Sequence, residues 1–466
     1  MQLILPSVLC IKPFINIYRM LNSFKIIMVL LFIAVLPAQG QEQQKADSLQ
    51  KKISKVEEDV QALKKIQFTG YLQTQFQLAE REGITSFAGG NFPENSQSRF
   101  QIRRGRVKLT WSGNLSKFVT QIDITEKGIA PKDVYLQFTD PWLRTIELTA
   151  GLFNRPFGNE ITMSSSVRES PERARIYQTL FPNERDAGIM LSVHPGNHSG
   201  LHWFKADAGF FNGTGIAADF DSHKDFIGRL SFTKENAGAF SGLTLGFSYY
   251  HGFWQSGTGK YYKSLAKTND GFRVFLPDST GDLHSARRSY YGINGQVSVK
   301  TALGTTLVRG EYLSGLQGGT SETSVSPSSL PKGKAVSKAD PVSGIVTTNT
   351  PSLPAMERPF AGGLVYIVHT ILQTRHQIVF KYDVYDPNTR ARENEIGKPA
   401  DPGDFAALTS ADIRYDTYGL GYIFQYASNL KIMLYYDIVR NEKTALTGFT
   451  SDLKDNVLTI RLQYKF

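Results

Sequence analysis

Hydrophobic and polar residues alternate along most of the chain after Ile66. The closing segment shows this most clearly, with one set apolar and the other mostly polar: Leu458, Ile460, Leu462, Tyr464 and Phe466 against Val457, Thr459, Arg461, Gln463 and Lys465. Because successive side chains of a β-strand point to opposite faces, a period of two predicts a strand with one apolar face. The alternation recurs at 106–111, 133–139, 145–152, 377–385, 418–426 and 430–438.

Sixteen segments of this kind are expected to be strands. They cover residues 66–79, 97–112, 115–125, 131–139, 143–153, 185–194, 200–211, 224–234, 243–255, 286–299, 303–314, 358–370, 374–386, 412–426, 429–440 and 452–466. Short connections at 113–114, 140–142, 194–199 and 427–428 contrast with long ones near 80–96, 154–184, 256–285, 315–357 and 387–411. Short turns at one end and long loops at the other are typical of outer-membrane barrels.

Alternation alone also fits a soluble sandwich, because an apolar face can meet either a core or lipid. Two observations favour the barrel. The chain ends on a strand whose last residue is the aromatic Phe466, as outer-membrane barrels commonly do. Lys381 and Asp383 lie on a polar face, which would be costly in a dry core but comfortable in a water-filled channel. The sequence therefore predicts an all-β fold, a transmembrane antiparallel β-barrel of about 16 strands over residues 67–466.

Residues 1–40 have the features of a leader and signal peptide. Lys25 precedes an apolar run from Ile26 to Leu36, and small residues follow it, with cleavage expected after Gly40. The run is too short for a spanning helix. The one cysteine of the chain, Cys10, lies in this segment, so the rest would have no disulfide and no thiolate metal site. We expect export to the bacterial outer membrane.

Residues 41–66 differ from the barrel region, because their apolar positions are spaced four and three apart. The stripe consists of Leu49, Ile53, Val56, Val60 and Leu63, with charged residues between them. This heptad spacing predicts a short helical segment of coiled-coil type. It could be an amphipathic helix that packs on the barrel or frays, or a small self-associating stalk.

The chain is basic, with a formal net charge of +10. Lys12, Arg19 and Lys25 are the basic residues of the leader, which has no acid, so the remaining chain would carry +7. A basic balance allows nucleic acid, an anionic membrane or small anions as partners and does not choose among them.

Three stretches resemble the phosphate-selective porin O and P family. They are Arg103-Arg104-Gly105-Arg106-Val107; Lys132-Asp133-Val134-Tyr135-Leu136 followed by 151–158; and Ser170-Pro171-Glu172-Arg173 continuing through 181–188. The likeness in motif covers roughly the first third of the barrel. It implies a sixteen-stranded trimeric porin whose third long loop, here 154–184, folds into the channel, and in which arginines and lysines line the channel for anions.

The candidate anion-binding residues lie on the second strand and in or beside this loop: Arg104, Arg106, Lys108, Arg155, Arg168, Arg173, Arg175 and Arg185. Alternation puts Arg104, Arg106 and Lys108 on the lumen side, because a charge facing lipid costs about 2–4 kcal/mol. Guanidinium groups can bind phosphate through two hydrogen bonds. The alternative is that these arginines pair with loop acids and hold the loop in place. The loop region has five of these arginines and also five acids, which are Glu160, Glu169, Glu172, Glu184 and Asp186.

The sequence thus predicts a passive diffusion channel for small anionic solutes such as phosphate or polyphosphate, with outer-membrane lipid and small anions as partners, a homotrimer as the assembly and no nucleic acid. Two alternatives stay open: a general-diffusion porin without phosphate preference, and a barrel with a structural or surface-interaction role. No catalytic motif, cofactor motif or metal site is found; the histidines lie near turns without supporting carboxylates. We therefore expect no enzyme activity.

Overall fold

The computed structural model describes residues 20–25, 27–29, 48–196, 199–237, 240–277, 285–333, 336–339, 346–400, 402–403 and 405–466. The chain divides into two compact units, residues 1–66 and 67–466. In the first unit residues 48–64 form a helix on which the heptad stripe from Leu49 to Leu63 is exposed; its self-association stays a prediction. The expected cleavage site after Gly40 lies outside the described residues. None of the helices in the described ranges is both long enough and apolar enough to span a membrane.

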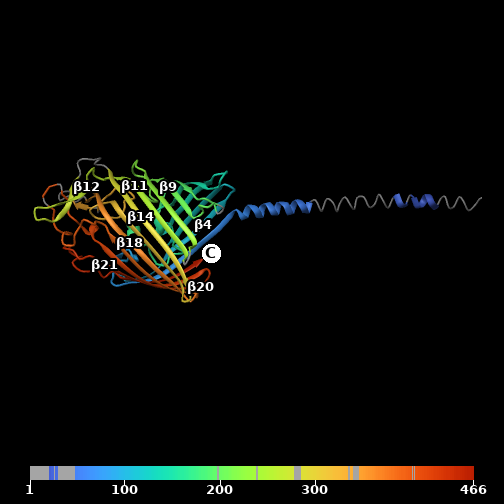
Figure 1. Ribbon diagram of the computed structural model, residues 1–466. Helices are drawn as coiled ribbons and strands as arrows, with labels where there is room; N and C mark the ends of the chain where they lie inside the picture. Colours follow the sequence, from blue (N-terminus) through green and yellow to red (C-terminus); the bar gives the residue numbers. More distant parts are fainter. Residues whose placement is uncertain are drawn as a thin grey trace, which may run out of the picture. The chain divides into compact units, whose positions relative to one another are not determined.

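The second unit is a closed antiparallel barrel, and its described residues contain sixteen wall strands (Figure 1). These are β1 (Ile66–Ala79), β4 (Ser98–Ser112), β5 (Ser116–Thr125), β6 (Gly128–Thr139), β7 (Ile146–Asn154), β8 (Arg185–Val193), β9 (Phe204–Phe211), β10 (Asp225–Ala237), β11 (Phe240–Gln255), β14 (Ser285–Thr301), β15 (Gly304–Gly319), β18 (Ala355–Ile371), β19 (His376–Asp386), β20 (Tyr415–Ala427), β21 (Leu430–Asn441) and β22 (Val457–Lys465). Neighbours in sequence pair, and β22 pairs with β1 from Tyr71–Lys465 to Ala79–Val457, which closes the wall. The expected strand number and order are confirmed.

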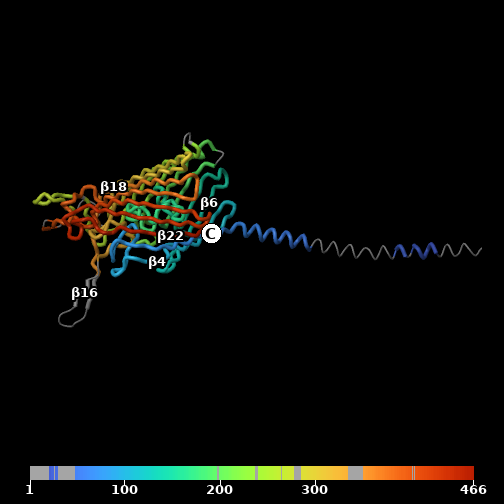
Figure 2. Tube along the Cα trace, turned by 90° about the horizontal axis from the view of Figure 1, so that it is seen from below, coloured from blue at the N-terminus to red at the C-terminus, as the bar shows by residue number. Residues whose placement is uncertain are grey.

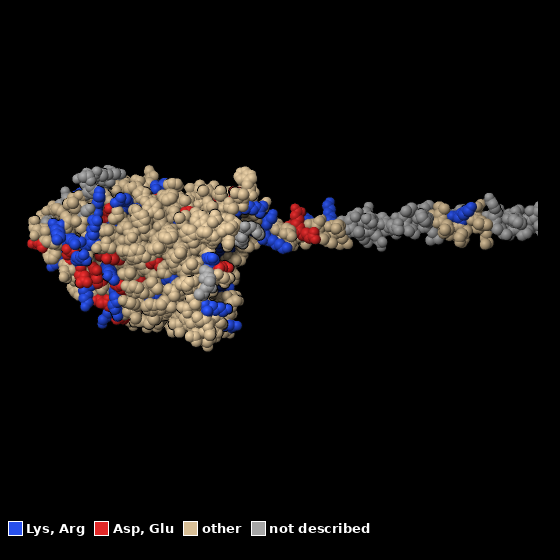
Figure 3. All heavy atoms as spheres, in the orientation of Figure 1, with Lys and Arg blue, Asp and Glu red and all other residues tan. Residues whose placement is uncertain are grey.

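The wall has the predicted alternation, with its apolar face outside. On β22, Ile460 and Leu462 are 43% and 46% exposed, whereas Thr459 is fully buried and Gln463 is 5% exposed. Figure 3 shows that uncharged side chains cover the middle of the visible wall, while charged ones gather mainly at one end. An apolar band of this kind is stable against hydrocarbon and not against water. The protein is therefore an outer-membrane barrel.

Long and short connections lie at opposite ends of the barrel (Figures 1 and 2). The chain ends at Phe466 beside the short turns, which in such barrels face the periplasm. Alternation gave no sign of three hairpins within the long loops. They are β2 (Thr85–Ser86) with β3 (Gly90–Asn91), β12 (Tyr261–Lys267) with β13 (Arg273–Pro277), and β16 (Val336–Ala339) with β17 (Val346–Asn349).

The third connection at the long-loop end of the barrel, residues 155–184 and called the inner loop below, folds into the barrel. It carries two short helices, α2 (Gly158–Thr162) and α3 (Arg175–Leu180). Its backbone and side chains bond to strands on opposite sides of the wall: Gly158 N–H donates to Ser248 Oγ of β11 at 3.0 Å, and Arg461 Nη1 of β22 donates to Pro171 O at 2.8 Å. The placement implied by the family resemblance is correct.

Much of the interior is packed rather than wet. An apolar cluster surrounds the inner loop and includes Phe157, Phe181, Tyr250 and Tyr290. Even Lys381 and Asp383, expected to be hydrated in the channel, are buried and pair with each other at 2.8 Å. That expectation was wrong, because aromatic residues of the strands and the inner loop fill this part of the lumen.

A second apolar cluster lies at the long-loop end. It joins inward-facing strand residues to loop residues that include Ile84, Phe92, Phe275, Ile396 and Leu408. The last of these loops also carries the 3-10 helix η1 (Ser410–Asp412), whose Asp412 pairs with Arg358 of β18 at 2.9 Å. The outer loops therefore pack against one another inside the rim of the barrel.

Candidate functional site

The basic residues of β4 face the lumen, and a shift in alternation brings an additional arginine inside. In the N-terminal, upper part of β4, Arg99 and Gln101 both donate to Gln77 of β1, at 3.0 and 2.8 Å. In the lower part of the same strand, Arg104 and Arg106 are buried. Inward positions are therefore odd-numbered from Arg99 to Arg103 and even-numbered from Arg104 onward. A slip of this kind is what a β-bulge produces, and it places two consecutive arginines on the lumen side.

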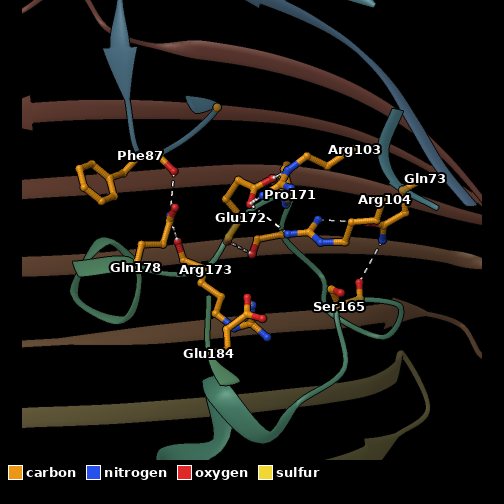
Figure 4. A network of polar contacts seen from close by, with 12 residues as sticks. Gln73, Phe87, Arg103, Arg104, Ser165, Pro171, Glu172, Arg173, Gln178 and Glu184 are labelled. Atoms are coloured by element: carbon orange, nitrogen blue, oxygen red, sulfur yellow. Dashed lines mark hydrogen bonds and ion pairs between the residues drawn. The ribbon is translucent and has the colours of Figure 1, made fainter. Parts of the chain in front are cut away.

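Both of these arginines bind one carboxylate of the inner loop, that of Glu172 (Figure 4). Arg103 Nε lies 2.6 Å from Glu172 Oε1, Arg104 Nη2 lies 3.3 Å from Oε2, and Arg461 Nη2 of β22 lies 3.2 Å from Oε1. Burial by itself would raise the pKa of Glu172, but Arg103 and Arg104 outweigh it and hold the pKa well below its ordinary value. One negative charge thus faces three positive ones.

A cavity of about 360 Å³ lies between the inner loop and this wall; we call it the inner cavity. Five basic residues line it against three acidic ones, so its lining is electropositive. The basic residues are Arg103, Arg104, Arg106, Lys132 and Arg173, and the acids are Asp123, Glu172 and Glu184.

Arg168 of the inner loop is a different case. It is 2% exposed, and none of its three guanidinium nitrogens has a hydrogen-bond partner among the described residues. It lies near enough to Arg104, Arg173 and Arg461 to repel them. Lys431 of β21 donates to the backbone oxygens of Ser166 and Arg168, at 3.1 and 3.3 Å. The guanidinium group of Arg168 is therefore buried without a hydrogen bond, with Glu160 as a nearby opposite charge and Arg104, Arg173 and Arg461 as nearby like charges.

Four other predicted residues are bound to acids. Arg106 lies 3.2 Å from Asp123, Arg185 lies 3.0 Å from Asp133, and Arg155 lies 3.9 Å from Asp186. Arg173 pairs with Glu184 and donates to Glu160 O at 2.7 Å. In these pairs both charges are mostly buried. The holding role considered as an alternative accounts for their contacts.

The remaining two predicted residues are not paired in this way. The guanidinium carbon of Arg175 lies 3.2 Å from the ring centroid of Tyr415 and 4.4 Å from that of Phe87, which are cation–π contacts. Lys108 is half-buried on the wall, and no ion pair is formed by it within the described part of the chain.

The predicted set left out several charged lumen residues. The site also includes Arg461, Lys431 and Lys132. Arg461 and Lys431 lie on a face that polar residues share in the alternation, whereas Lys132 has the phase of the apolar Val134 and lies where the β5–β6 register shifts. Arg309, which pairs with Glu169 at 2.8 Å, holds the other side of the inner loop. Strand phase could have found Arg461, Lys431 and Arg309 but not Lys132, and the contacts of these residues depend on the fold of the inner loop. In the described ranges no group of three His, Cys, Asp or Glu could hold a metal ion.

Comparison with known proteins bears on the fold. No family model and no curated protein sequence matches the chain. Among solved structures, OprB of Pseudomonas putida at high pH matches with a TM-score of 0.51 and 9% identity, over 87% of this chain and 96% of its own. DcaP, an outer membrane channel of Acinetobacter baumannii, matches at 0.47 with 10% identity over 86% and 97%, and OmpT of Vibrio cholerae without loop L8 matches at 0.48 with 10% identity over 86% and 99%. The likeness to OprB shows a porin-type barrel.

Proposed function

We propose that the protein is a passive outer-membrane diffusion channel for small anions. The observation that carries the proposal is the buried cation cluster of Arg168, Arg104, Arg173, Arg461 and Lys431 beside the electropositive inner cavity. Arg104 and Arg461 share the carboxylate of Glu172, and Arg173 pairs with Glu184, so the five cations of the cluster outnumber the acids they contact. The cluster is the part of the interior where positive charge exceeds its partners.

The cost of the Arg168 environment supports an anion. A buried charge without a partner costs several kcal/mol, and nearby like charges add to that cost. A small anion that reaches Arg168 would remove it. Guanidinium nitrogens present two parallel donors that match phosphate oxygens, so a preference for phosphate or polyphosphate is the finer part of the proposal.

The alternative, a general-diffusion channel without phosphate preference, draws on the paired arginines. Arg106 with Asp123 and Arg185 with Asp133 hold the wall and the inner loop through buried pairs. Because such pairs are neutral overall, they add little net charge to the lumen. Under the proposal, selectivity therefore depends on Arg168, Lys431 and Lys132 more than on Arg106 or Arg185.

Planar-bilayer recording of the purified protein tests the proposal. In a salt gradient the reversal potential should report anion preference, and phosphate should block chloride current. Arg168→Gln should shift the reversal potential toward cations, whereas Arg375→Gln, at an exposed turn, should leave it unchanged. Cation preference of the unaltered protein contradicts the proposal. Anion preference that persists in Arg168→Gln and falls in Arg104→Gln would move the selective site to β4.

The homotrimer implied by the family resemblance belongs to the same proposal. Apolar residues on the outer wall near the barrel closure, including Phe76, Phe100 and Leu462, line a groove of about 640 Å³. Such a surface can pack against lipid or against a second copy. The mass of the detergent-solubilised protein, measured by light scattering with the detergent subtracted, distinguishes a trimer from a single barrel.

A further inference from the structure

The lumen is filled unevenly around its circumference. The cluster that includes Phe157 and Tyr290 packs the inner loop against strands from β7 to β21, and the loop cluster that includes Phe92 and Phe275 packs the outer end. The polar inner cavity lies instead along β4, β5 and β6. A solute that reaches this cavity along the barrel axis would have to pass the apolar loop cluster.

The wall itself offers another way in beside β4. The β4–β5 register runs from Ser112–Lys117 to Arg106–Asp123 and stops there, although β4 continues upward to Ser98. Above that point Gly105 N–H donates to the Asp123 side chain and Ile102 N–H to the Glu126 side chain, at 3.2 Å each. The β5–β6 turn therefore does not extend as far toward the long-loop end as β4 does. The part of β4 before Arg106 has no backbone pairing with β5 in the described residues.

A second polar cavity occupies this place; we call it the outer cavity. Its volume is about 250 Å³, and residues of the first long loop, of upper β4 and of the β5–β6 turn line it, among them Asn91, Arg99, Glu126 and Lys127. The outer and inner cavities share three lining residues, Arg103, Glu172 and Gln178. Figure 4 shows Arg103 and Glu172 in contact, and Gln178 bonded to the backbone oxygens of Phe87 and Arg173. One ion pair thus stands where the two cavities meet.

We propose that small anions reach the inner cavity from the side, through the outer cavity at the β4–β5 seam, and that Arg103 and Glu172 form the gate between the two cavities. This inference rests on the proposed function, because it names the route to the same site. Its first support is the position of the polar space, which follows β4 rather than the axis. Its second is the continuity of basic residues from Lys127 and Arg99 through Arg103 to Arg104.

The contacts of Glu172 allow the gate to open without exposing a lone buried charge. Arg103 has a side chain that is 34% exposed, whereas Arg104 and Arg461 are 3% and 2% exposed. When Arg103 turns toward the outer cavity, Glu172 keeps two arginine partners. An anion in the outer cavity competes with Glu172 for Arg103, so the solute itself favours opening.

Cysteine labelling tests the route. Cys10 is the one natural cysteine and lies in the leader expected to be removed, so an introduced cysteine is labelled alone. In Lys127→Cys and Asn91→Cys a bulky neutral thiosulfonate reagent should lower the conductance severalfold, and a reducing agent should restore it. The matched control is Lys267→Cys, an exposed lysine on the β12 hairpin of another outer loop; the reagent should leave its conductance unchanged.

The outcomes separate the route from the function. Conductance and anion preference before labelling test the function, and a protein that fails there contradicts the proposed function. A conducting protein whose current is insensitive to label at both Lys127→Cys and Asn91→Cys, or sensitive at Lys267→Cys, overturns the lateral route.

Arg103→Ala tests the gate by itself. In about 1 M salt the Debye length is about 3 Å, so the loss of one charge has little effect on anion attraction and the change in conductance reports the width of the gate. We expect the conductance to rise and to stay sensitive to label at a cysteine in position 127. An unchanged or lower conductance contradicts the gate.

Discussion

The two sides of the inner loop are built from different chemistry. On one side Phe181 contacts the rings of Phe157, Tyr250 and Tyr290, with centroids 4.9 to 5.8 Å apart. On this side Glu311 of β15 also accepts the backbone N–H groups of Asn159 and Glu160, at 2.9 and 2.8 Å. We call it the aromatic side. It is packed, and the carboxylate of Glu311 accepts three hydrogen bonds there, the third from the Tyr177 hydroxyl.

The opposite side faces β4 and β22 and can be called the basic side. There Glu172 pairs with three arginines, the guanidinium group of Arg168 has no hydrogen-bond partner among the described residues, and the inner cavity of about 360 Å³ separates the loop from the wall. Dense packing fixes a segment, whereas unbalanced charge beside a polar cavity leaves room for a ligand. We infer that the aromatic side holds the loop so that the basic side can act on solutes.

The largest effect is expected from Phe181→Ala on the aromatic side. A buried phenylalanine truncated to alanine typically costs about 3–5 kcal/mol, and Phe181 is 1% exposed. Denaturant unfolding should show this loss, and conductance should rise because the inner loop is less firmly held. Phe138→Ala, on the lipid-facing wall, is the matched control and should unfold close to the unaltered protein. Equal stabilities of the two variants would contradict the holding role.

A smaller effect is expected from Glu311→Gln. The carboxylate accepts two backbone N–H groups and the Tyr177 hydroxyl, and hydrogen bonds to charged groups contribute about 1.5–3 kcal/mol. The substitution keeps the size of the side chain but replaces one acceptor oxygen with a donor. We expect noisier open-channel current at unchanged ion selectivity. Glu147→Gln, a wall residue bonded to Gln137, serves as the control; altered selectivity in Glu311→Gln would mean that the two sides are not separable.

The aromatic and basic sides of the inner loop also differ in what the sequence can predict about them. The strand phase is local, so alternation located all sixteen wall strands and the inward faces of Arg104, Arg106 and Arg461. The position of the inner loop came from the family resemblance. That Arg103 and Arg104 both reach Glu172 needs a one-residue slip within β4, which no alternating pattern announces. Alternation also gave no sign that aromatic rings would fill the lumen.

Arg168 is a second feature that the sequence alone could not single out. Its residue type and its place in the inner loop made it a candidate, together with seven other basic residues. What distinguishes it is that its buried guanidinium group has no hydrogen-bond partner in the described structure, and that depends on where segments distant in sequence meet. Counting charges in the loop gives a balance of zero, yet the folded loop separates the charges into paired and unpaired groups.

The smallest effect concerns the pH dependence of two carboxyl groups, Glu172 in the inner loop and Glu442 in the last outer loop. Glu172 in the lumen has a pKa held well below its ordinary value, so the stability it contributes is lost only in strong acid. Glu442, in the last outer loop, has a pKa raised to about 7, first by burial and then by the charges of Asp386 and Glu393. Opposite pH responses of the inner and outer loops follow.

For Glu442 the folded loop keeps a proton that the unfolded chain releases above about pH 4.3. The stability of the outer loop therefore falls as the pH rises from about 4.3 to about 7, and is flat above that. Hydrogen exchange of residues 442–456, corrected for its intrinsic pH dependence, should become faster between about pH 5 and about pH 7, while the inner loop should not change. Glu442→Gln should abolish the difference. If the inner loop follows the same pH profile, then the two loops move together and the aromatic side does not hold the inner loop independently.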